Sequence, residues 1–491
     1  MDAIAAIFAS GSPLSNAVDA ADSFVWGWAM IVLLLGTHVF MTIRTKFIQR
    51  KLGTAIKLSI SHADTGAEGD VSQFGALTTA LAATIGTGNI VGVATGLFFG
   101  GPGAVFWMWI TGVFGIATKY SETYISVKYR VKDHNGEMLG GAMYALERGF
   151  KNKGLGKVLG VLFALFAFIA SFGIGASVQS NALSGVITSY IEPLFASSDQ
   201  MLATSIMIGI VLMILVGIVI MGGIKSITKV TTKLVPLMAV LYVAGCIVII
   251  GMNGQYVGEA VGMIVTCAFT GEAAFGGAVG SGVALALQYG FKRGLFSNES
   301  GLGSAPLVAA NATTKNPARQ ALVSMTGTFW DTVIVCAITG IMLVSTMLAN
   351  PEIQAGILSG EITAAAQLTT TAFSEIPVLG PIVLSVGMIL FSYSTMLGWA
   401  QYGNRAVAYL FGKKGIRPYQ IVFLLFVFWG CIGGGDLVWN LSDISNALMA
   451  VPNCIAVLGL SAVIAKGTQH YVYEKNLDEV DETPIPKFDA K

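Results

Sequence analysis

Eleven stretches of mostly apolar residues, separated by shorter polar segments, follow one another along the chain. A helix needs about 20 such residues to cross the hydrocarbon layer of a bilayer. The pattern therefore predicts an all-α polytopic membrane protein with about eleven transmembrane helices. We place these helices at residues 24–43, 74–99, 104–127, 157–188, 203–222, 234–252, 261–290, 319–347, 379–404, 418–437 and 443–465.

The Lys and Arg residues alternate with these stretches and predict their orientation. All 28 of them can be placed on one side of the membrane. Because basic residues beside membrane spans are retained on the cytoplasmic side, we expect the amino terminus outside and the carboxyl terminus inside a cell (inner) membrane. The basic clusters occupy residues 44–57, 119–132, 148–157, 225–233, 292–293, 315–319, 405–417 and 466–491.

Composition supports a membrane protein and excludes some partners. Hydrophobic residues make up 54% of the 491 residues and charged residues 11%, which is too apolar for one soluble core. The net charge is +1 and the cations flank the spans, so we expect the lipid bilayer and not nucleic acid as a partner. We assign residues 1–466 to a single transmembrane domain. Residues 467–491 form a polar cytoplasmic tail, which we expect to be poorly ordered.

Three predicted spans contain glycine-rich interruptions: TIGTGNIVG in 74–99, SFGIGASVQSN in 157–188 and GEAAFGGAVGSG in 261–290. The first and third occupy matching places in two halves of five spans each, residues 74–252 and 261–465, with 24–43 as an extra amino-terminal helix. An odd number of spans per half means that the second half runs inverted. Paired broken helices in inverted repeats indicate the binding site of a secondary transporter.

A broken helix offers partial charges to a dipolar solute. Free N–H groups around Gly86 to Asn89 suit a carboxylate, and carbonyls near residues 274–277 suit an ammonium group. The run Phe391 to Thr395 adds three Ser or Thr hydroxyls that could hold a hard cation such as Na⁺. Gln179 and Trp399 could orient and cover a small ligand, although from the residues alone an interhelical hydrogen bond and ordinary packing are the better explanations.

Other residues leave alternatives open. Glu272 and Asp331 are candidate intramembrane carboxylates, so proton coupling is the alternative to sodium coupling. Lys119 and Glu122 are three residues apart and predict a local ion pair at the cytoplasmic edge. The four His residues are scattered, and the five Cys residues sit singly in apolar runs. We therefore expect no enzyme activity and no cofactor. An ion channel would need a polar stripe along several spans, which is not seen.

Several motifs resemble those of the alanine/glycine:cation symporter family, the sodium:alanine symporters. They are GALTTALAATIGTGNIVGVATGLFFGGPGAVFWMW (75–109), RGLFSNESGLGSAP (293–306), NGEMLGG, GGIKSI, ALVSMTGTFWDT and YSTMLGWAQYG, and the likeness extends from about residue 24 to 464. The resemblance implies eleven spans, with the five-plus-five inverted repeat of the leucine-transporter fold and one extra amino-terminal helix. It also implies sodium-coupled import of alanine or glycine by alternating access.

The resemblance also implies site residues. The implied substrate pocket consists of Thr84, Gly86, Thr87, Gly88, Asn89, Gln179, Phe275, Gly276 and Trp399. The implied sodium site uses carbonyls near Thr84 and Asn89, the Phe391 carbonyl and the hydroxyls of Ser394 and Thr395. Ser300 and Ala142 depart from residues common in the family. Glu272 stands at a position that varies among members, which leaves pocket selectivity and proton coupling open.

Overall fold

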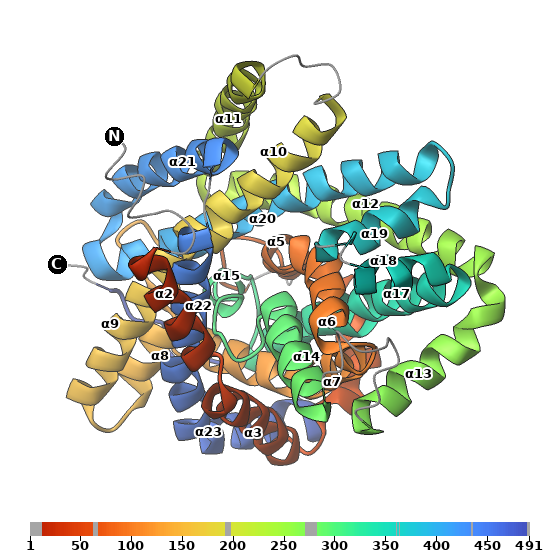
Figure 1. The fold of residues 1–491 in the computed structure, drawn as a ribbon. Helices are drawn as coiled ribbons and strands as arrows, with labels where there is room; N and C mark the ends of the chain where they lie inside the picture. Colours follow the sequence, from red (N-terminus) through yellow and green to blue (C-terminus); the bar gives the residue numbers. More distant parts are fainter. Residues whose placement is uncertain are drawn as a thin grey trace.

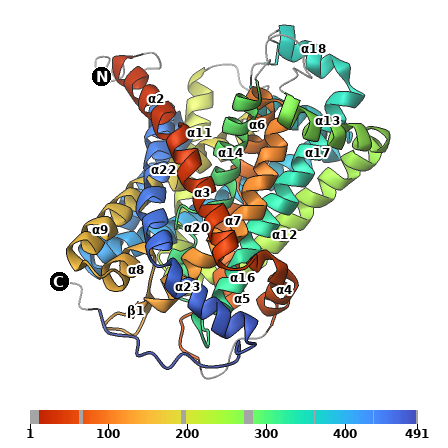
Figure 2. The ribbon, with the colours of Figure 1, turned by 90° about the horizontal axis from the view of Figure 1, so that it is seen from below.

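The computed structural model describes residues 12–61, 67–191, 198–270, 282–359, 361–362, 364–433 and 436–488. Its helices form one bundle with two opposite faces (Figures 1 and 2). The start of α2 (Pro13–Val25) and α18 (Pro351–Ser359) lie on one face, which we call the amino-terminal face. On the other, the basic face, lie α4 (Leu52–Ser59), β1 (Val131–Lys132) and α23 (Ser461–Thr468).

The remaining elements are mostly long apolar helices, some joined end to end through 3₁₀ or π turns, here labelled η. In the first half they are α3 Trp28–Arg44, η1 Ile48–Lys51, α5 Gln73–Thr84, η2 Gly88–Gly92, α6 Val93–Gly100, α7 Gly103–Lys128, β2 Met138–Leu139, α8 Ala142–Gly149, α9 Lys153–Ala170, η3 Ser171–Ser177, α10 Val178–Ile191, α11 Ser198–Ile220 and α12 Gly223–Met252. In the second they are η5 Gly254–Tyr256, α13 Val257–Thr270, α14 Val283–Asn298, α15 Pro306–Ala309, α16 Pro317–Thr328, η6 Phe329–Cys336, α17 Ala337–Ala349, α19 Ala365–Ser374, α20 Leu379–Phe411, η7 Lys413–Gly415, α21 Ile416–Gly433, α22 Asp436–Gly459 and η8 Gln469–Tyr473. Strands β1 and β2 form an antiparallel hairpin.

Eight helices of the described residues are long and apolar enough to span a membrane, and the bent pair of α5 with α6 makes nine. Two of the eleven predicted spans fall outside this number. Span 104–127 corresponds to α7, whose 26 residues are long enough to cross a bilayer. Its second half contains the charged residues Lys119 and Glu122, which make this helix less apolar. Span 261–290 is divided between α13 and α14, on either side of residues 271–281, which lie outside the described residues.

The glycine-rich interruption predicted in 157–188 does not break that helix. Residues Lys153–Ser189 form one long helix in which η3 is a π-helical segment. A π segment carries an extra residue in one turn and often marks a functional site. The glycines at this position therefore accompany a wider, π-helical turn and not a break. Because glycine has no side chain, α20 can pack closely here, with Trp399 against Gly175.

Lys292 and Arg293 do not belong with the other basic clusters, which corrects the prediction that all basic residues share one side. Lys292 Nζ lies 2.7 Å from Asp22 Oδ2 of α2 and 3.5 Å from Asp443 Oδ2 of α22. Asp22 lies toward the end of the first span opposite Arg44, so Lys292 lies toward the amino-terminal face. The preference of basic residues for the cytoplasmic side does not hold for Lys292, because two carboxylates neutralise its charge locally.

The predicted pair of Lys119 and Glu122 forms, with Nζ and Oε1 3.2 Å apart, but it lies in the protein interior and not at an exposed edge. Lys119 Nζ also donates to the carbonyl of Glu299, 3.1 Å away. Glu122 Oε2 accepts from the Gly301 N–H and from Asn453 Nδ2. Burying these charges is tolerable because each is paired or hydrogen-bonded.

The carboxyl-terminal tail packs on the basic face, which corrects the expectation of poor order for residues up to 488. The Phe488 N–H donates to the Lys132 carbonyl at 2.7 Å, and the Lys132 N–H donates to Pro486 at 2.9 Å. The Phe488 ring lies edge-to-face on Tyr144, 5.2 Å between centroids. The tail is thus held by backbone pairing and aromatic packing.

Candidate functional site

The first predicted break is confirmed at the end of α5. Ile85 leaves the helix in an extended conformation, with φ −75° and ψ 99°. The chain resumes at Gly88 with a bend of 53° between α5 and the helix formed by η2 and α6. The sequence produces this break locally, because two glycines and an amide within four residues lower helix propensity.

Asn89 closes this break with its own side chain. The Gly86 N–H donates to Asn89 Oδ1 at 2.9 Å, so this amide, assigned above to a substrate carboxylate, already has a partner. Asn89 Nδ2 donates to Asp331 Oδ1 at 2.7 Å and to the Asp331 carbonyl at 3.2 Å. Asn89 therefore fixes the two ends of the break to each other and to η6.

Asp331, one of the two candidate carboxylates, is buried beside the break. Its Oδ2 accepts from Ser297 Oγ at 2.8 Å and from Thr332 Oγ1 at 2.7 Å. Cys336 Sγ lies 3.2 Å from Ser297 Oγ. Sequence reasoning missed Ser297, Thr332 and Cys336. The sequence signal that could have identified them is the polar pair Asp331 and Thr332 inside an apolar run. This run forms the π-helical segment η6.

The hydroxyl run on α20 faces the same break. A Cβ placed on Gly86 would lie 2.6 Å from Thr395 Oγ1, so the two residues are in direct contact. Thr395 Oγ1 is buried and has no hydrogen-bond partner among the described residues. Ser394 Oγ donates to the Phe391 carbonyl at 2.9 Å, which is the local bond expected of a helical serine. The α20 backbone itself is unbroken.

The other predicted substrate residues lie in three places. Thr87 Oγ1 is 3.5 Å from Gln179 Oε1, which joins the break to α10. Trp399 is buried against η3, where a Cβ on Gly175 would lie 2.3 Å from the Trp399 Cβ. Thr84 lies at the end of α5 and bonds its own helix at Ala80. Phe275, Gly276 and Glu272 lie outside the described residues.

A second interruption follows α14, at a place the sequence did not indicate. Glu299, Gly301 and Gly303 have φ values of 54°, 90° and 77°, after which α15 begins at Pro306. Positive φ values end a helix and suit glycine. The end of α14, just before this interruption, contacts the first break, because a Cβ on Gly88 would lie 3.3 Å from the Phe296 ring.

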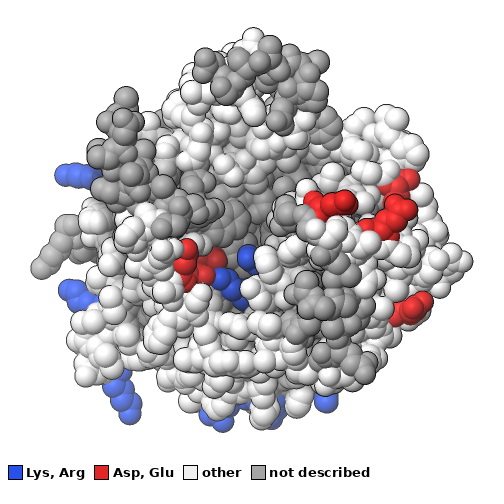
Figure 3. All heavy atoms as spheres, in the orientation of Figure 1, with Lys and Arg blue, Asp and Glu red and all other residues white. Residues whose placement is uncertain are grey.

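A cavity of about 400 Å³ lies beside the first break, among η2, α6, α10, α14, α19 and α20. Figure 3 looks onto the amino-terminal face and shows this face hollowed near its centre, where basic and acidic side chains gather. The described residues that line the cavity are Thr87, Gly88, Val91, Gly92, Thr95, Ala182, Gly185, Val186, Ser189, Arg293, Phe296, Ala366 and Met388.

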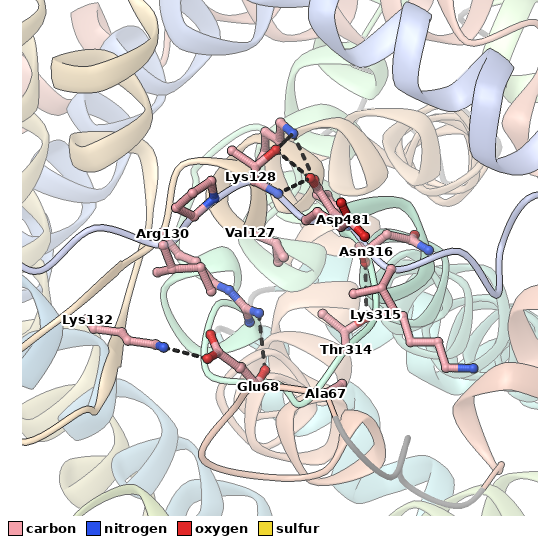
Figure 4. Close-up of a pocket in the computed structure, with 16 residues that line it drawn as sticks. Ala67, Glu68, Val127, Lys128, Arg130, Lys132, Thr314, Lys315, Asn316 and Asp481 are labelled. Carbon is pink, nitrogen blue, oxygen red and sulfur yellow. Dashed lines mark hydrogen bonds and ion pairs between the residues drawn. The ribbon is translucent and has the colours of Figure 1, made fainter.

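A second cavity, of about 430 Å³, lies between the tail and the basic face (Figure 4). Its charged walls are paired with one another: Lys128 Nζ lies 2.8 Å from Asp481 Oδ2, and Lys132 Nζ lies 2.6 Å from Glu68 Oε1. The Arg130 guanidinium donates to the Glu68 carbonyl at 3.1 Å. Because these groups satisfy one another, the cavity is part of how the tail docks.

The fold defines the class of protein. The solved structure of MhsT in complex with L-phenylalanine superposes with a TM-score of 0.57 at 16% identity, over 84% of this chain and 95% of that one. Likeness at this identity shows the fold alone. The chain is thus an all-α membrane protein of the leucine-transporter fold.

The family follows from sequence comparison. The model of the sodium:alanine symporter family matches residues 12–484, and the chain belongs to this family. The sodium/alanine symporter AgcS of Methanococcus maripaludis is 48% identical over 92% of this chain and 96% of its own. The probable sodium/glutamine symporter GlnT and the amino-acid carrier protein AlsT of Bacillus subtilis are 34% and 30% identical, each over 94% of this chain and over 91% and 93% of their own.

Proposed function

We propose that this protein imports a small neutral amino acid, alanine or glycine, together with Na⁺, by alternating access across a cell (inner) membrane. The amino terminus would lie outside and the carboxyl terminus in the cytoplasm, and Na⁺ would be the coupling ion, with no cofactor. Membership in the sodium:alanine symporter family supports sodium-coupled symport of an amino acid. The 48% identity to a sodium/alanine symporter supports alanine as the substrate.

One observation carries the sodium part of the proposal. Thr395 Oγ1 is buried, lacks a hydrogen-bond partner among the described residues and points at the break beside Gly86. A buried hydroxyl without a hydrogen-bond partner costs folding free energy, and a hard cation, which prefers oxygen ligands, would coordinate its oxygen. Carbonyls near Thr84 and Asn89, with Phe391 C=O and Ser394 Oγ, would supply further oxygen ligands.

The substrate would lie at the inner end of the 400 Å³ cavity. Thr87 and Gln179 offer polar side chains there, and Gly86 and Gly88 let a solute approach the backbone. Trp399 would limit the size of the solute, because it packs tightly on Gly175. Phe275 and Gly276 complete the set that we assign to the substrate from the resemblance.

Coupling to one Na⁺ would drive accumulation. Each inward elementary charge contributes about 2.3 kcal/mol per 100 mV of membrane potential, and the sodium gradient adds to this. Alternating access would be rocking of the helices at the break against the surrounding scaffold. Proton coupling through Asp331 is less suited, because three donors from Asn89, Ser297 and Thr332 already satisfy its carboxylate.

The test is alanine uptake into proteoliposomes that carry either an inward Na⁺ gradient or a pH gradient without Na⁺. Uptake driven by Na⁺ is expected, and robust accumulation with the pH gradient alone would refute sodium coupling. Thr395→Ala should raise the Na⁺ concentration for half-maximal uptake, whereas Thr395→Ser keeps the hydroxyl and should not. Gln179→Ala should mainly raise the KM for alanine. Competition by a panel of amino acids then ranks the substrates.

A further inference from the structure

The 400 Å³ cavity has one charged residue among its described lining residues, and that residue is Arg293. The other lining side chains are apolar, or carry only a hydroxyl, or belong to glycine. A single cation in such a surrounding acts on every charged solute that enters, because little else screens it. The proposed site described above does not use Arg293.

Arg293 lies close to the break, on the side of the amino-terminal face. Phe296 of the same helix meets Gly88, with 3.3 Å from the Phe296 ring to a Cβ placed on that glycine. Arg293 precedes Phe296 by three residues, so it shares the same side of α14 at about 4.5 Å along the helix axis. Its stem packs against α6, where a Cβ on Gly96 would lie 3.8 Å from the Arg293 Cβ.

The guanidinium retains capacity to bind. Arg293 Nε is buried and has no hydrogen-bond partner within the described part of the chain. The carboxylates of Asp22 and Asp443 lie 2.7 Å and 3.5 Å from Lys292 Nζ. Asp443 also attracts Arg293 electrostatically, but no ion pair or hydrogen bond joins these two side chains in the described part of the chain. An arginine fork matches a carboxylate with two parallel hydrogen bonds. The geometry therefore leaves a carboxylate receptor facing an apolar cavity.

We infer that Arg293 is a specificity-determining residue that receives the carboxylate of an incoming amino acid about one helical turn above the break. From there the solute moves to Thr87 and Gln179. The same charge excludes amino acids that carry a second cationic group. This inference rests on the proposed function and adds a charge filter at the entrance of the same site.

The experiment uses the full chain in proteoliposomes with an inward Na⁺ gradient. Labelled alanine uptake is measured for the wild type, Arg293→Gln, Arg293→Lys and Thr95→Val, which changes an uncharged residue of the same cavity. Two competitors of equal size are compared, homoserine, which is neutral overall, and 2,4-diaminobutyrate, which has a second ammonium group. Binding of alanine to the purified protein is followed in parallel by thermal stabilisation in detergent.

Arg293→Gln should raise the alanine KM about tenfold. It should also raise the potency of 2,4-diaminobutyrate relative to homoserine at least fivefold. Arg293→Lys keeps the charge, so it should keep the exclusion while losing part of the alanine affinity. Thr95→Val should leave the ratio of the two competitors unchanged.

An unchanged competitor ratio in Arg293→Gln overturns the inference, even if total activity falls, because a merely structural role would lower stability without altering charge preference. If the wild type shows no Na⁺-driven alanine uptake, the proposed function fails instead. The competitor ratio is then taken from thermal stabilisation, where equal responses of the wild type and Arg293→Gln to both compounds again overturn the inference. If Arg293→Gln does not fold, Arg293→Lys decides: an alanine affinity equal to that of the wild type contradicts the fork.

Discussion

Asn89 and Asp331, 242 residues apart in sequence, meet through a 2.7 Å hydrogen bond from the amide of one to the carboxylate of the other. The same Asn89 side chain accepts the Gly86 N–H across the break of the first interrupted helix. The same Asp331 carboxylate accepts the Ser297 hydroxyl from α14. The pair therefore ties together three segments that the proposed transport cycle must move or hold.

Exchanging the two residues tests this link. Asp331→Asn removes the negative charge and replaces the oxygen that accepts from Ser297 and Thr332 with an NH₂ donor. Asn89→Asp makes two carboxylates face each other. A hydrogen bond to a charged group contributes about 1.5–3 kcal/mol, so each single variant should lose uptake by at least about tenfold. The double variant keeps one amide and one carboxylate and should recover most of it.

Alanine uptake by the four proteins in proteoliposomes measures the effect, with surface expression as the control. A double variant no better than the weaker single variant would mean that these side chains act separately.

The close contact at Gly86 predicts that a side chain added at this position will impair transport. A Cβ at this position would lie 2.6 Å from Thr395 Oγ1, whereas one at Gly92 meets nothing within 4 Å. Gly86→Ala should therefore abolish most Na⁺-dependent uptake, and Gly92→Ala should keep most of it. The double variant Gly86→Ala with Thr395→Ala should regain folding stability, because the clash is relieved, but not normal Na⁺ affinity. Equal uptake by the two glycine variants would contradict the contact.

The sequence predicted those parts of the site that depend on neighbouring residues. The break at Gly86 to Asn89 follows from low helix propensity, and the hydroxyl run near Thr395 is visible because it interrupts an apolar helix. The partners of these residues across the bundle could be predicted only as a group. Which hydroxyl faces which glycine depends on how α5 and α20 pack.

The second interruption and the charge placement could not be predicted in this way. The chain turns at Glu299 because α14 ends beside buried Lys119 and Glu122, which come from a distant helix. The glycines near residues 274–277, where the sequence suggested the second break, lie outside the described residues. Lys292 was assigned to the wrong face because its partners, Asp22 and Asp443, lie far away in the chain.

The docked tail predicts a stability effect separate from transport. The Phe488 ring packs edge-to-face on Tyr144 and stacks with Tyr409 at 6.3 Å between centroids. Removing a half-buried aromatic ring should cost about 1–2 kcal/mol. Phe488→Ala should lower the Tm of the purified protein in detergent, while Val480→Ala, at a residue that is 56% exposed, should not. Identical Tm values would show that the tail adds no stability.

The hairpin on the basic face predicts a pH dependence. Glu137 Oε1 lies 2.7 Å from the Arg405 guanidinium, and Oε2 lies 3.1 Å from Lys413 Nζ. Burial alone would raise the pKa of this carboxyl, but Arg405 and Lys413 together hold the pKa below its usual value of 4.5. A carboxyl with a lowered folded-state pKa adds stability above pH 4.5 and loses it as the pH falls through the folded pKa.

Glu137→Gln removes this contribution at every pH. At pH 7 the variant should be less stable than the wild type, on the order of 1 kcal/mol for a partly buried pair in a small network. The difference should shrink as the pH falls below 4.5, because the wild-type carboxyl becomes protonated and resembles the amide. Thermal unfolding of both proteins in detergent between pH 7 and about pH 3.5 measures it. A stability difference that stays constant over this range would contradict the ion pair as its source, since packing of the side chain alone does not titrate.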